Sequence, residues 1–240
     1  MKTRNLIIAV LVVVCFTPLL LSMIPGSSFF QQEKEIRNVG NFSSVGLAID
    51  ADLILKQDQE CSVTLEAERH MLDLIVTEVK DGKLRIKYNK WSVPRHERIT
   101  VYVSMITVDG LSLSGSGSIV ADGPVKTGEL DLTISGSGNI RLDQLTATEV
   151  EASISGSGNI SVAGPATVNE MEIGISGSGD VDAEQLEVNS MEVAISGSGD
   201  CKVRVTGFLK AAVSGSGNIY CTGNPQVDAR VSGSGKVITQ

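Results

Sequence analysis

Apolar and polar residues alternate in six segments of the second half of the chain. In the first of these segments, single polar residues separate Leu130, Leu132 and Ile134. A period of two places these apolar side chains on one face of an extended strand. We therefore predict six β-strands, each with one buried face. The other apolar triplets are Val150, Ala152 and Ile154; Met171, Ile173 and Ile175; Met191, Val193 and Ile195; Leu209, Ala211 and Val213; and Val227, Ala229 and Val231.

Each of these segments leads into the tetrapeptide Ser-Gly-Ser-Gly. Successive motifs are 21, 20, 21, 20, 18 and 18 residues apart. A period of this length with strand-like alternation is typical of solenoids, in which each repeat stacks on its neighbours. We predict an all-β fold, a parallel β-helix-like solenoid with one coil of about 20 residues for each repeat. The motifs begin at Ser114, Ser135, Ser155, Ser176, Ser196, Ser214 and Ser232.

The alternation resumes in phase after each motif, as Ile140 and Ile160 show. The motif glycines therefore share the inward parity of the apolar residues. Glycine within a strand pattern indicates a bend or a close approach of another backbone segment. We expect the motif to form a corner of each coil.

The outward parity carries the two motif serines and the residue after the second glycine. In a parallel stack these side chains would form a polar ladder with rungs about 4.8 Å apart. One interpretation is structural, with stacked hydroxyl and amide groups bonded to one another and to nearby backbone, and this interpretation is favoured. The other is functional, with a flat lattice of hydroxyls presented to a glycan, ice or another surface. The candidate binding residues are Ser135, Ser137, Asn139, Ser155, Ser157, Asn159, Ser176, Ser178, Asp180, Ser196, Ser198 and Asp200.

Residues 29–110 contain none of these motifs. Strands are predicted at Ser62–Glu68 and Arg98–Val103, and a hairpin with a primed turn is predicted around Asp81-Gly82. Because a solenoid needs a cover on its open end, we expect residues 29–110 to be an N-terminal β segment that caps the solenoid of residues 111–240.

The N-terminus has the layout of a secretory signal. Lys2 and Arg4 precede an aliphatic stretch from Leu6 to Leu21, and small residues follow as far as Ser28. Residues 1–28 are therefore predicted to be a signal peptide of an exported protein, located in the periplasm or at the outer membrane or cell surface. An uncleaved N-terminal anchor is the alternative, because the apolar run approaches the ~18 residues that can span a bilayer.

The chain has 20 basic and 28 acidic side chains. Loss of the leader would remove Lys2 and Arg4 and increase the acidic excess. A net negative charge makes nucleic acid an unsuitable partner. From Leu111 onward, 15 acidic and 7 basic residues are present, so most of the excess belongs to the repeats, where a solvated surface explains it.

The segments VTEVKDGKLRIKY (Val76–Tyr88) and ITVYVSM (Ile99–Met105), followed by LSLSGSGSI and serial SGSGN or SGSGD, are similar to a known bacterial family. The chain resembles the putative autotransporter adhesin, head GIN domain family from about Ile36 to Val237. The resemblance implies a β-helical exported protein of Gram-negative bacteria with an adhesin-like role.

We find no catalytic constellation in the sequence. The two histidines, His70 and His96, precede the repeats, and the serines lack the Gly-x-Ser-x-Gly context of a nucleophile. Asp180 and Asp200 share one column, so a calcium site or the carboxylate pair of a polysaccharide lyase or hydrolase is the alternative. We predict a protein that is not an enzyme and that needs no cofactor.

Cysteine positions point to buried thiols. Cys201 and Cys221 fall on the inward parity of adjacent rungs but two residues out of register. Their Cα atoms would be roughly 8 Å apart, too far for a disulfide.

The leading hypothesis is a non-enzymatic envelope or surface protein that binds a glycan, a surface or an envelope protein through the solenoid side. A self-associating structural role is a further alternative. The last rung, from Val227 to Ile238, would leave strand edges exposed. A weak homodimer through this C-terminal rung is therefore expected, and a monomer protected by Arg230 and Lys236 is the alternative.

Overall fold

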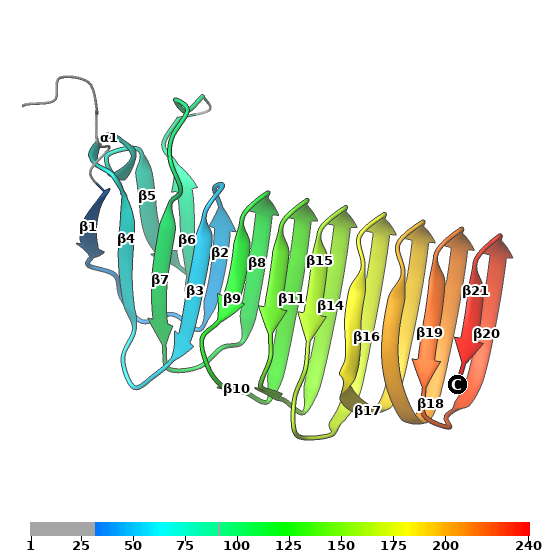
Figure 1. Ribbon diagram of the computed structural model, residues 1–240. Coiled ribbons are helices and arrows are strands. Elements are labelled where there is room, and N and C mark those ends of the chain that lie inside the picture. Colours follow the sequence, from blue (N-terminus) through cyan, green and yellow to red (C-terminus); the bar gives the residue numbers. More distant parts are fainter. Residues whose placement is uncertain (1–31, 91) are drawn as a thin grey trace, which may run out of the picture.

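Two long faces of parallel strands enclose a continuous apolar core (Figure 1). The computed structural model describes residues 32–90 and 92–240. Face one contains the strands that end in the Ser-Gly motifs, and face two contains the strands that follow them. In the repeat half, face one consists of β8 (Gly110–Gly115), β11 (Glu129–Gly136), β14 (Glu149–Gly156), β16 (Val168–Gly177), the later parts of β17 (Val181–Gly197) and β18 (Cys201–Gly215), and β20 (Gln226–Gly233).

Face two is shorter in each coil. It consists of β9 (Ser118–Ala121), β12 (Asn139–Leu142), β15 (Asn159–Val162), the first parts of β17 and β18, β19 (Asn218–Thr222) and β21 (Lys236–Thr239). In two of the early coils, β10 (Val125–Lys126) and β13 (Leu145–Thr146) pair on the return path between the faces. The predicted parallel β-solenoid is confirmed.

The alternating apolar residues fill the space between the faces. Leu132 pairs in register with Ala152, which pairs with Ile173, and all three side chains are fully buried. Removal of such columns from water stabilises the fold by about 25 cal/mol for each Å² of apolar surface. The last triplet is the exception to the predicted buried face, because Val227 and Val231 remain 38% and 45% exposed.

Each motif forms a corner, as its glycines predict. The first glycine has a φ angle that only glycine adopts readily, for example 141° at Gly136. The second glycine contacts the preceding coil so closely that a Cβ atom on Gly138 would lie 2.4 Å from the carbonyl oxygen of Gly117. The backbone N–H of Ser137 donates to the carbonyl oxygen of Gly115 at 2.9 Å. Glycine is therefore required at both positions of the corner.

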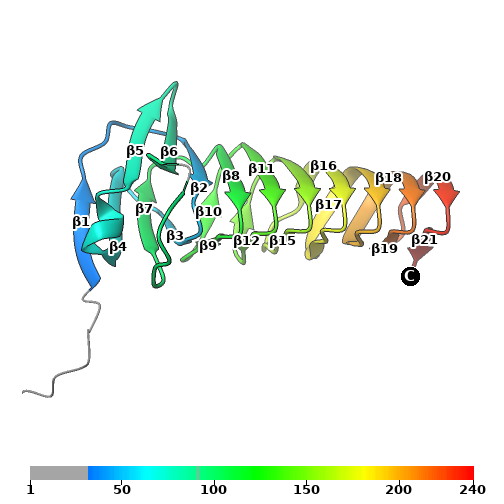
Figure 2. The same ribbon diagram turned by 90° about the horizontal axis from the view of Figure 1, so that it is seen from above.

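Two further coils precede the repeats, and they do not follow chain order. β2 (Ser44–Ala48) and β3 (Asp52–Gln57) pair in parallel with β8 and β9. β6 (Lys83–Tyr88) and β7 (Thr100–Met105) pair in parallel with the other edges of β2 and β3. The chain therefore forms one coil, builds a second coil outside it, and then passes to the repeats (Figure 2).

Antiparallel strands close the N-terminal end of the stack. β4 (Ser62–Glu68) pairs with β7, β1 (Gln32–Arg37) pairs with β4, and β5 (Ile75–Lys80) pairs with β6. The single turn of helix α1 (Arg69–Leu72) buries Met71 and Leu72 against this end. We call β1, β4, α1 and β5 the cap.

Most of the predictions for this segment are confirmed. The strand at 62–68 has the predicted bounds, and Asp81 and Gly82 both have positive φ, as a primed turn requires. The strand predicted from Arg98 begins two residues later, at Thr100. The division of the chain at residue 110 stays a prediction, although β2 shows that solenoid winding already begins at Ser44.

The predicted signal peptide or anchor, residues 1–28, lies outside the described residues. Within residues 32–90 and 92–240, no helix has the length and apolar character needed to cross a membrane.

Candidate binding groove and polar ladder

The predicted polar ladder surrounds a corner of the solenoid. Ser135 stands near the end of β11 on face one, Ser137 lies in the bend, and Asn139 begins β12 on face two. A flat lattice, the alternative interpretation of these residues, does not describe this arrangement, because the positive φ of the intervening glycine turns the chain. The first serines on face one are Ser135, Ser155, Ser176 and Ser196; those in the bend are Ser137, Ser157, Ser178 and Ser198; and the column beside face two contains Asn139, Asn159, Asp180 and Asp200.

The column beside face two joins one coil to the next through its side chains. The Nδ2 of Asn159 donates to the Oδ1 of Asn139 at 3.0 Å. The backbone N–H of Asp180 donates to the Oδ1 of Asn159 at 3.1 Å, and that of Asp200 donates to the Oδ1 of Asp180 at 2.8 Å. Asn218, which was not among the candidate residues, continues the column by donating from its backbone N–H to Asp200. These contacts support the structural interpretation of this column.

Asp180 and Asp200 each use one oxygen atom in this column. Among residues 32–90 and 92–240, no three His, Cys, Asp or Glu side chains are grouped closely enough to hold a metal ion. Both carboxylates accept hydrogen bonds from the backbone N–H groups of the following coil.

A shallow groove of about 610 Å³ crosses five strands of face one, from β14 to β20. Strand register aligns Ser153 with Gly174, Gly174 with Ala194, and Ala194 with Ala212, so small outward residues form the floor. We call this the serine groove, because one of its sides is the column of first motif serines. The two columns are Ser153, Gly174, Ala194, Ala212 and Arg230, and Ser155, Ser176, Ser196, Ser214 and Ser232.

Sequence reasoning found part of this groove. Ser155, Ser176 and Ser196 were among the candidate binding residues, whereas Ser214, Ser232 and the floor were not. The available signal was the residue two positions before the first serine, which is Ser153, Gly174, Ala194 and Ala212 in four successive repeats. Because strand pairing brings these positions together, small side chains recurring at one place in the repeat indicate a hollow on the surface.

Carboxylates border the floor on the side away from the serines. Glu151, Glu172 and Glu192 pair in register along face one. Lys210 continues this column and forms an ion pair with Glu192 at 2.8 Å. The groove therefore has a hydroxyl side and a predominantly acidic side.

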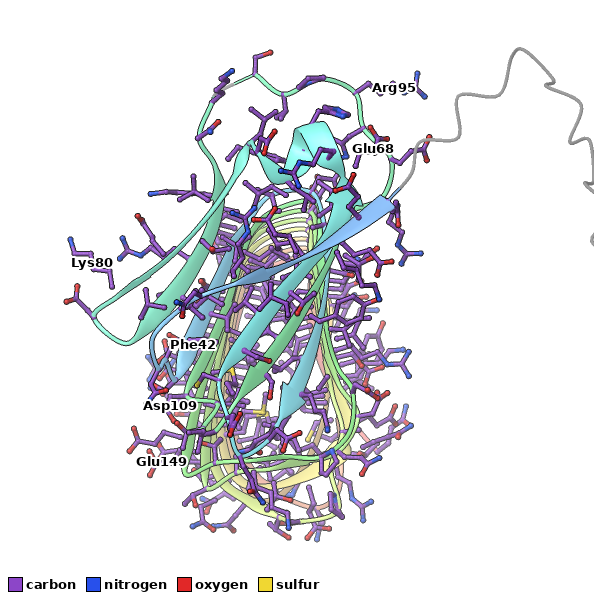
Figure 3. The ribbon with its side chains drawn as sticks, turned by 90° about the vertical axis from the view of Figure 1, so that its left-hand side faces the viewer. Phe42, Glu68, Lys80, Arg95, Asp109 and Glu149 are labelled. Carbon is purple, nitrogen blue, oxygen red and sulfur yellow. The ribbon has the colours of Figure 1, made fainter. Side chains whose placement is uncertain are left out.

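A second hollow, of about 730 Å³, lies beside the serine groove toward the cap. Seven carboxylates line it, and none of its lining residues is basic. Carboxylates aligned in register repel one another, and this repulsion opposes strand pairing. Solvent and salt reduce the repulsion at an exposed site. Figure 3 shows Asp109 and Glu149 on the outer side of the solenoid. The carboxylates are those of Asp109, Glu129, Asp131, Glu149, Glu151, Glu170 and Glu172.

Both histidines contact residues close to them in the N-terminal segment. His70 Nδ1 lies 3.1 Å from the Oε2 of the buried Glu68, although this oxygen has no hydrogen-bond partner of good geometry. His96 Nε2 lies 3.2 Å from the hydroxyl oxygen of Tyr88. Neither side chain lines the serine groove.

Cys201 and Cys221 are buried and carry free thiols. Cys221 pairs with Val203 and Cys201 pairs with Ile219, so the predicted offset of two residues is confirmed. Burial raises the pKa of the Cys201 thiol far above its ordinary range, and the nearby Asp182 carboxylate adds to this effect.

The described surface is that of a β-solenoid with a groove along one face, lined by small side chains and a column of serines. The family model of the putative auto-transporter adhesin, head GIN domain matches residues 41–225. The chain belongs to this family. No curated protein matches the chain.

Crystal structures of three bacterial proteins have the same fold. A putative adhesin from Bacteroides fragilis is 21% identical, with a TM-score of 0.80 over 88% of this chain and 97% of that chain. A putative lipid binding protein from Parabacteroides distasonis is 23% identical, with a TM-score of 0.72 over 87% and 96%. A putative adhesin from the same organism is 25% identical, with a TM-score of 0.70 over 88% and 97%. The family and the two adhesins are described as adhesins rather than enzymes.

Proposed function

We propose that this chain is a non-enzymatic exported protein of the Gram-negative cell envelope or surface, and that it binds a neutral glycan chain in the serine groove. The observation that carries the proposal is the groove, which extends across five strands on the exposed side of the solenoid. The adhesin description of the family supports a binding role.

The lining of the groove suits a sugar polymer. Serine hydroxyls both donate and accept hydrogen bonds, and they recur at the strand spacing of about 4.8 Å. The absence of large side chains at Gly174 and Ala194 allows the face of a sugar ring to approach the sheet. Carboxylates such as Glu172 can accept hydrogen bonds from sugar hydroxyls.

Charge defines the class of glycan. Glu151 and Glu172 lie in the column next to the floor, and they would repel uronate or sulfate groups at the β14 end of the groove, whereas a neutral sugar meets no such penalty. Arg230, at the β20 end, is the one charged residue among those that line the groove. This preference distinguishes the proposed function from that of a lyase or hydrolase acting on acidic polysaccharides, because such an enzyme must attract a negatively charged chain.

Two double serine variants provide a matched test. Ser155 and Ser176 line the groove, whereas Ser157 and Ser178 lie in the bend beyond it. Binding of the purified protein to an array of neutral and acidic glycans should weaken for Ser155→Ala with Ser176→Ala. The pair Ser157→Ala with Ser178→Ala should bind like the unsubstituted protein. Equal binding by both variants would exclude the groove as the site.

A bulky substitution gives an independent test. Ala194→Trp should fill the floor of the groove and abolish glycan binding, while Ser161→Trp places the same side chain on face two and should have no effect. Phospholipid vesicles form a third arm, since one structural relative is described as a lipid binding protein. Binding to vesicles alone, or product release from a uronate polymer, would contradict the proposed function.

A further inference from the structure

The last strand of face one has an open edge. β20 pairs with β18 on one side, and within residues 32–90 and 92–240 no strand pairs with its other side. The inward side chains of this strand consequently reach solvent: Val231 is 45% exposed, whereas Val213 in the same column one rung earlier is 3% exposed. An exposed edge with an apolar stripe is a template for pairing with another strand.

The sequence of this strand is complementary to itself. Val227-Asp228-Ala229-Arg230-Val231 has an apolar residue at its centre, opposite charges on either side of the centre and valine at both ends. In an antiparallel pair, directly opposite residues project to the same face. A two-fold axis at Ala229 would therefore place Val227 opposite the Val231 of a second copy, and Asp228 opposite its Arg230.

Neighbouring registers are less favourable. A shift of one residue would set inward side chains against outward ones. A two-fold axis at Asp228 would place two aspartates opposite each other, and one at Arg230 would place two arginines opposite each other. Only the register centred on Ala229 places valine opposite valine and also aspartate opposite arginine.

We propose that two copies of this chain associate end to end by antiparallel pairing of their β20 strands about Ala229. The interface is isologous, because the same strand contributes from both copies. A two-fold contact uses the same edge of both copies, so pairing at β20 gives a closed dimer rather than a filament. The cap lies at the opposite end of the solenoid (Figure 1).

Pairing of two edges joins face one of both copies into one continuous sheet. The outward side of each face one then points in the same direction, and so do the two serine grooves. If the proposed glycan binding holds, a polymer or surface can engage both grooves at once, and the effective affinity rises without any new contact at either site. The dimer itself does not depend on that function.

Charge reversal tests the register through complementation. Light scattering or sedimentation should show the mass of the unsubstituted protein rising toward twice the monomer mass with concentration. Arg230→Asp places aspartate opposite aspartate at two symmetric positions, and Asp228→Arg places arginine opposite arginine. Each variant should weaken association by about tenfold. A mixture of the two variants restores both opposite-charge pairs and should form the heterodimer.

Lys202→Asp is the matched control, because it makes the same change of charge at an outward position away from the β20 edge. It should associate like the unsubstituted protein. A monomeric mass for the unsubstituted protein at all concentrations would overturn the proposal. The same holds if the charge variants stay monomeric when mixed, or if each of them dimerises alone as well as the unsubstituted protein does.

Discussion

The Oδ1 of Asp200 accepts a hydrogen bond from the backbone N–H of Asn218, one coil further on, at 2.8 Å. The same oxygen also accepts from the Nδ2 of Asn218 at 3.0 Å. A single side-chain atom thus holds two donors of the following coil in place. The polar residue after the motif therefore has a structural role in the stacking of coils.

Asp200→Ala should destabilise the fold, because it leaves the backbone N–H of Asn218 without its acceptor. The expected loss in free energy of unfolding is about 1–2 kcal/mol, measured by urea denaturation. Asp200→Asn keeps an oxygen at the same place and should lose much less. Equal loss in both variants would show that the carboxylate charge, rather than the hydrogen bonds, stabilises this corner.

Glycine at the corner should be irreplaceable, whereas glycine on the groove floor should not. A Cβ atom on Gly158 would lie 2.3 Å from the carbonyl oxygen of Gly138, while one on Gly174 would meet only the Ser153 hydroxyl at 3.6 Å. Gly158→Ala should therefore greatly reduce the midpoint of thermal unfolding. Gly174→Ala should leave it unchanged or raise it, since alanine restricts the unfolded chain. A small effect of Gly158→Ala on this midpoint would mean that adjacent coils can move apart without loss of stability.

The buried thiol of Cys201 should make the fold sensitive to alkaline pH. Its folded pKa is raised above the ordinary value of 9.0, so its contribution to stability is complete below that pH and is lost as pH rises. Cys201→Val, which matches the aliphatic residues Val181 and Ile219 in its column, should reduce the loss of stability between about pH 8 and about pH 11.

Cys61→Val is the control for the alkaline experiment, because Cys61 is only half-buried. Native Cys61 should also react with a thiol reagent well before Cys201, which mass spectrometry of the labelled peptides can resolve. Early labelling of Cys201 would contradict the tight packing of its column.

Relief of like charge on face one should stabilise the protein at low salt. Glu151 lies between Asp131 and Glu172 in register, so Glu151→Lys should raise the temperature of unfolding. Glu187→Lys is the matched reversal at a carboxylate that faces Arg204 at 3.4 Å, and it should lower that temperature. Both shifts should shrink in concentrated salt; shifts that persist there would point to packing rather than charge.

The sequence alone was sufficient for the coils because their determinants are local. Alternation over three apolar positions, as at Leu130, Leu132 and Ile134, specifies which side of a strand is buried. Repetition then specifies stacking, and Asp81-Gly82 specifies a hairpin through backbone preference.

The groove and the order of the N-terminal coils depend on contacts between distant residues. Ser153 and Ala212 belong to one surface only because three successive strand pairings align them, and no single repeat contains that information. Likewise, β6 pairs with the edge of β2 that faces away from the repeats, and no repeated motif in the sequence indicates this pairing. The flat lattice does not fit for a different reason, since it treats the motif as one straight strand, although the motif glycines already indicate a corner such as the one at Gly136.

Each repeat coil pairs only with the coil before it and the coil after it. Stability in such an array is a series of couplings between nearest neighbours. A whole coil could therefore be inserted or deleted between two equivalent corners while the junctions on either side stay the same. Each inserted or deleted coil would therefore lengthen or shorten the serine groove by one strand spacing, about 4.8 Å. Evolution or an experimenter can change the length of the groove in this way.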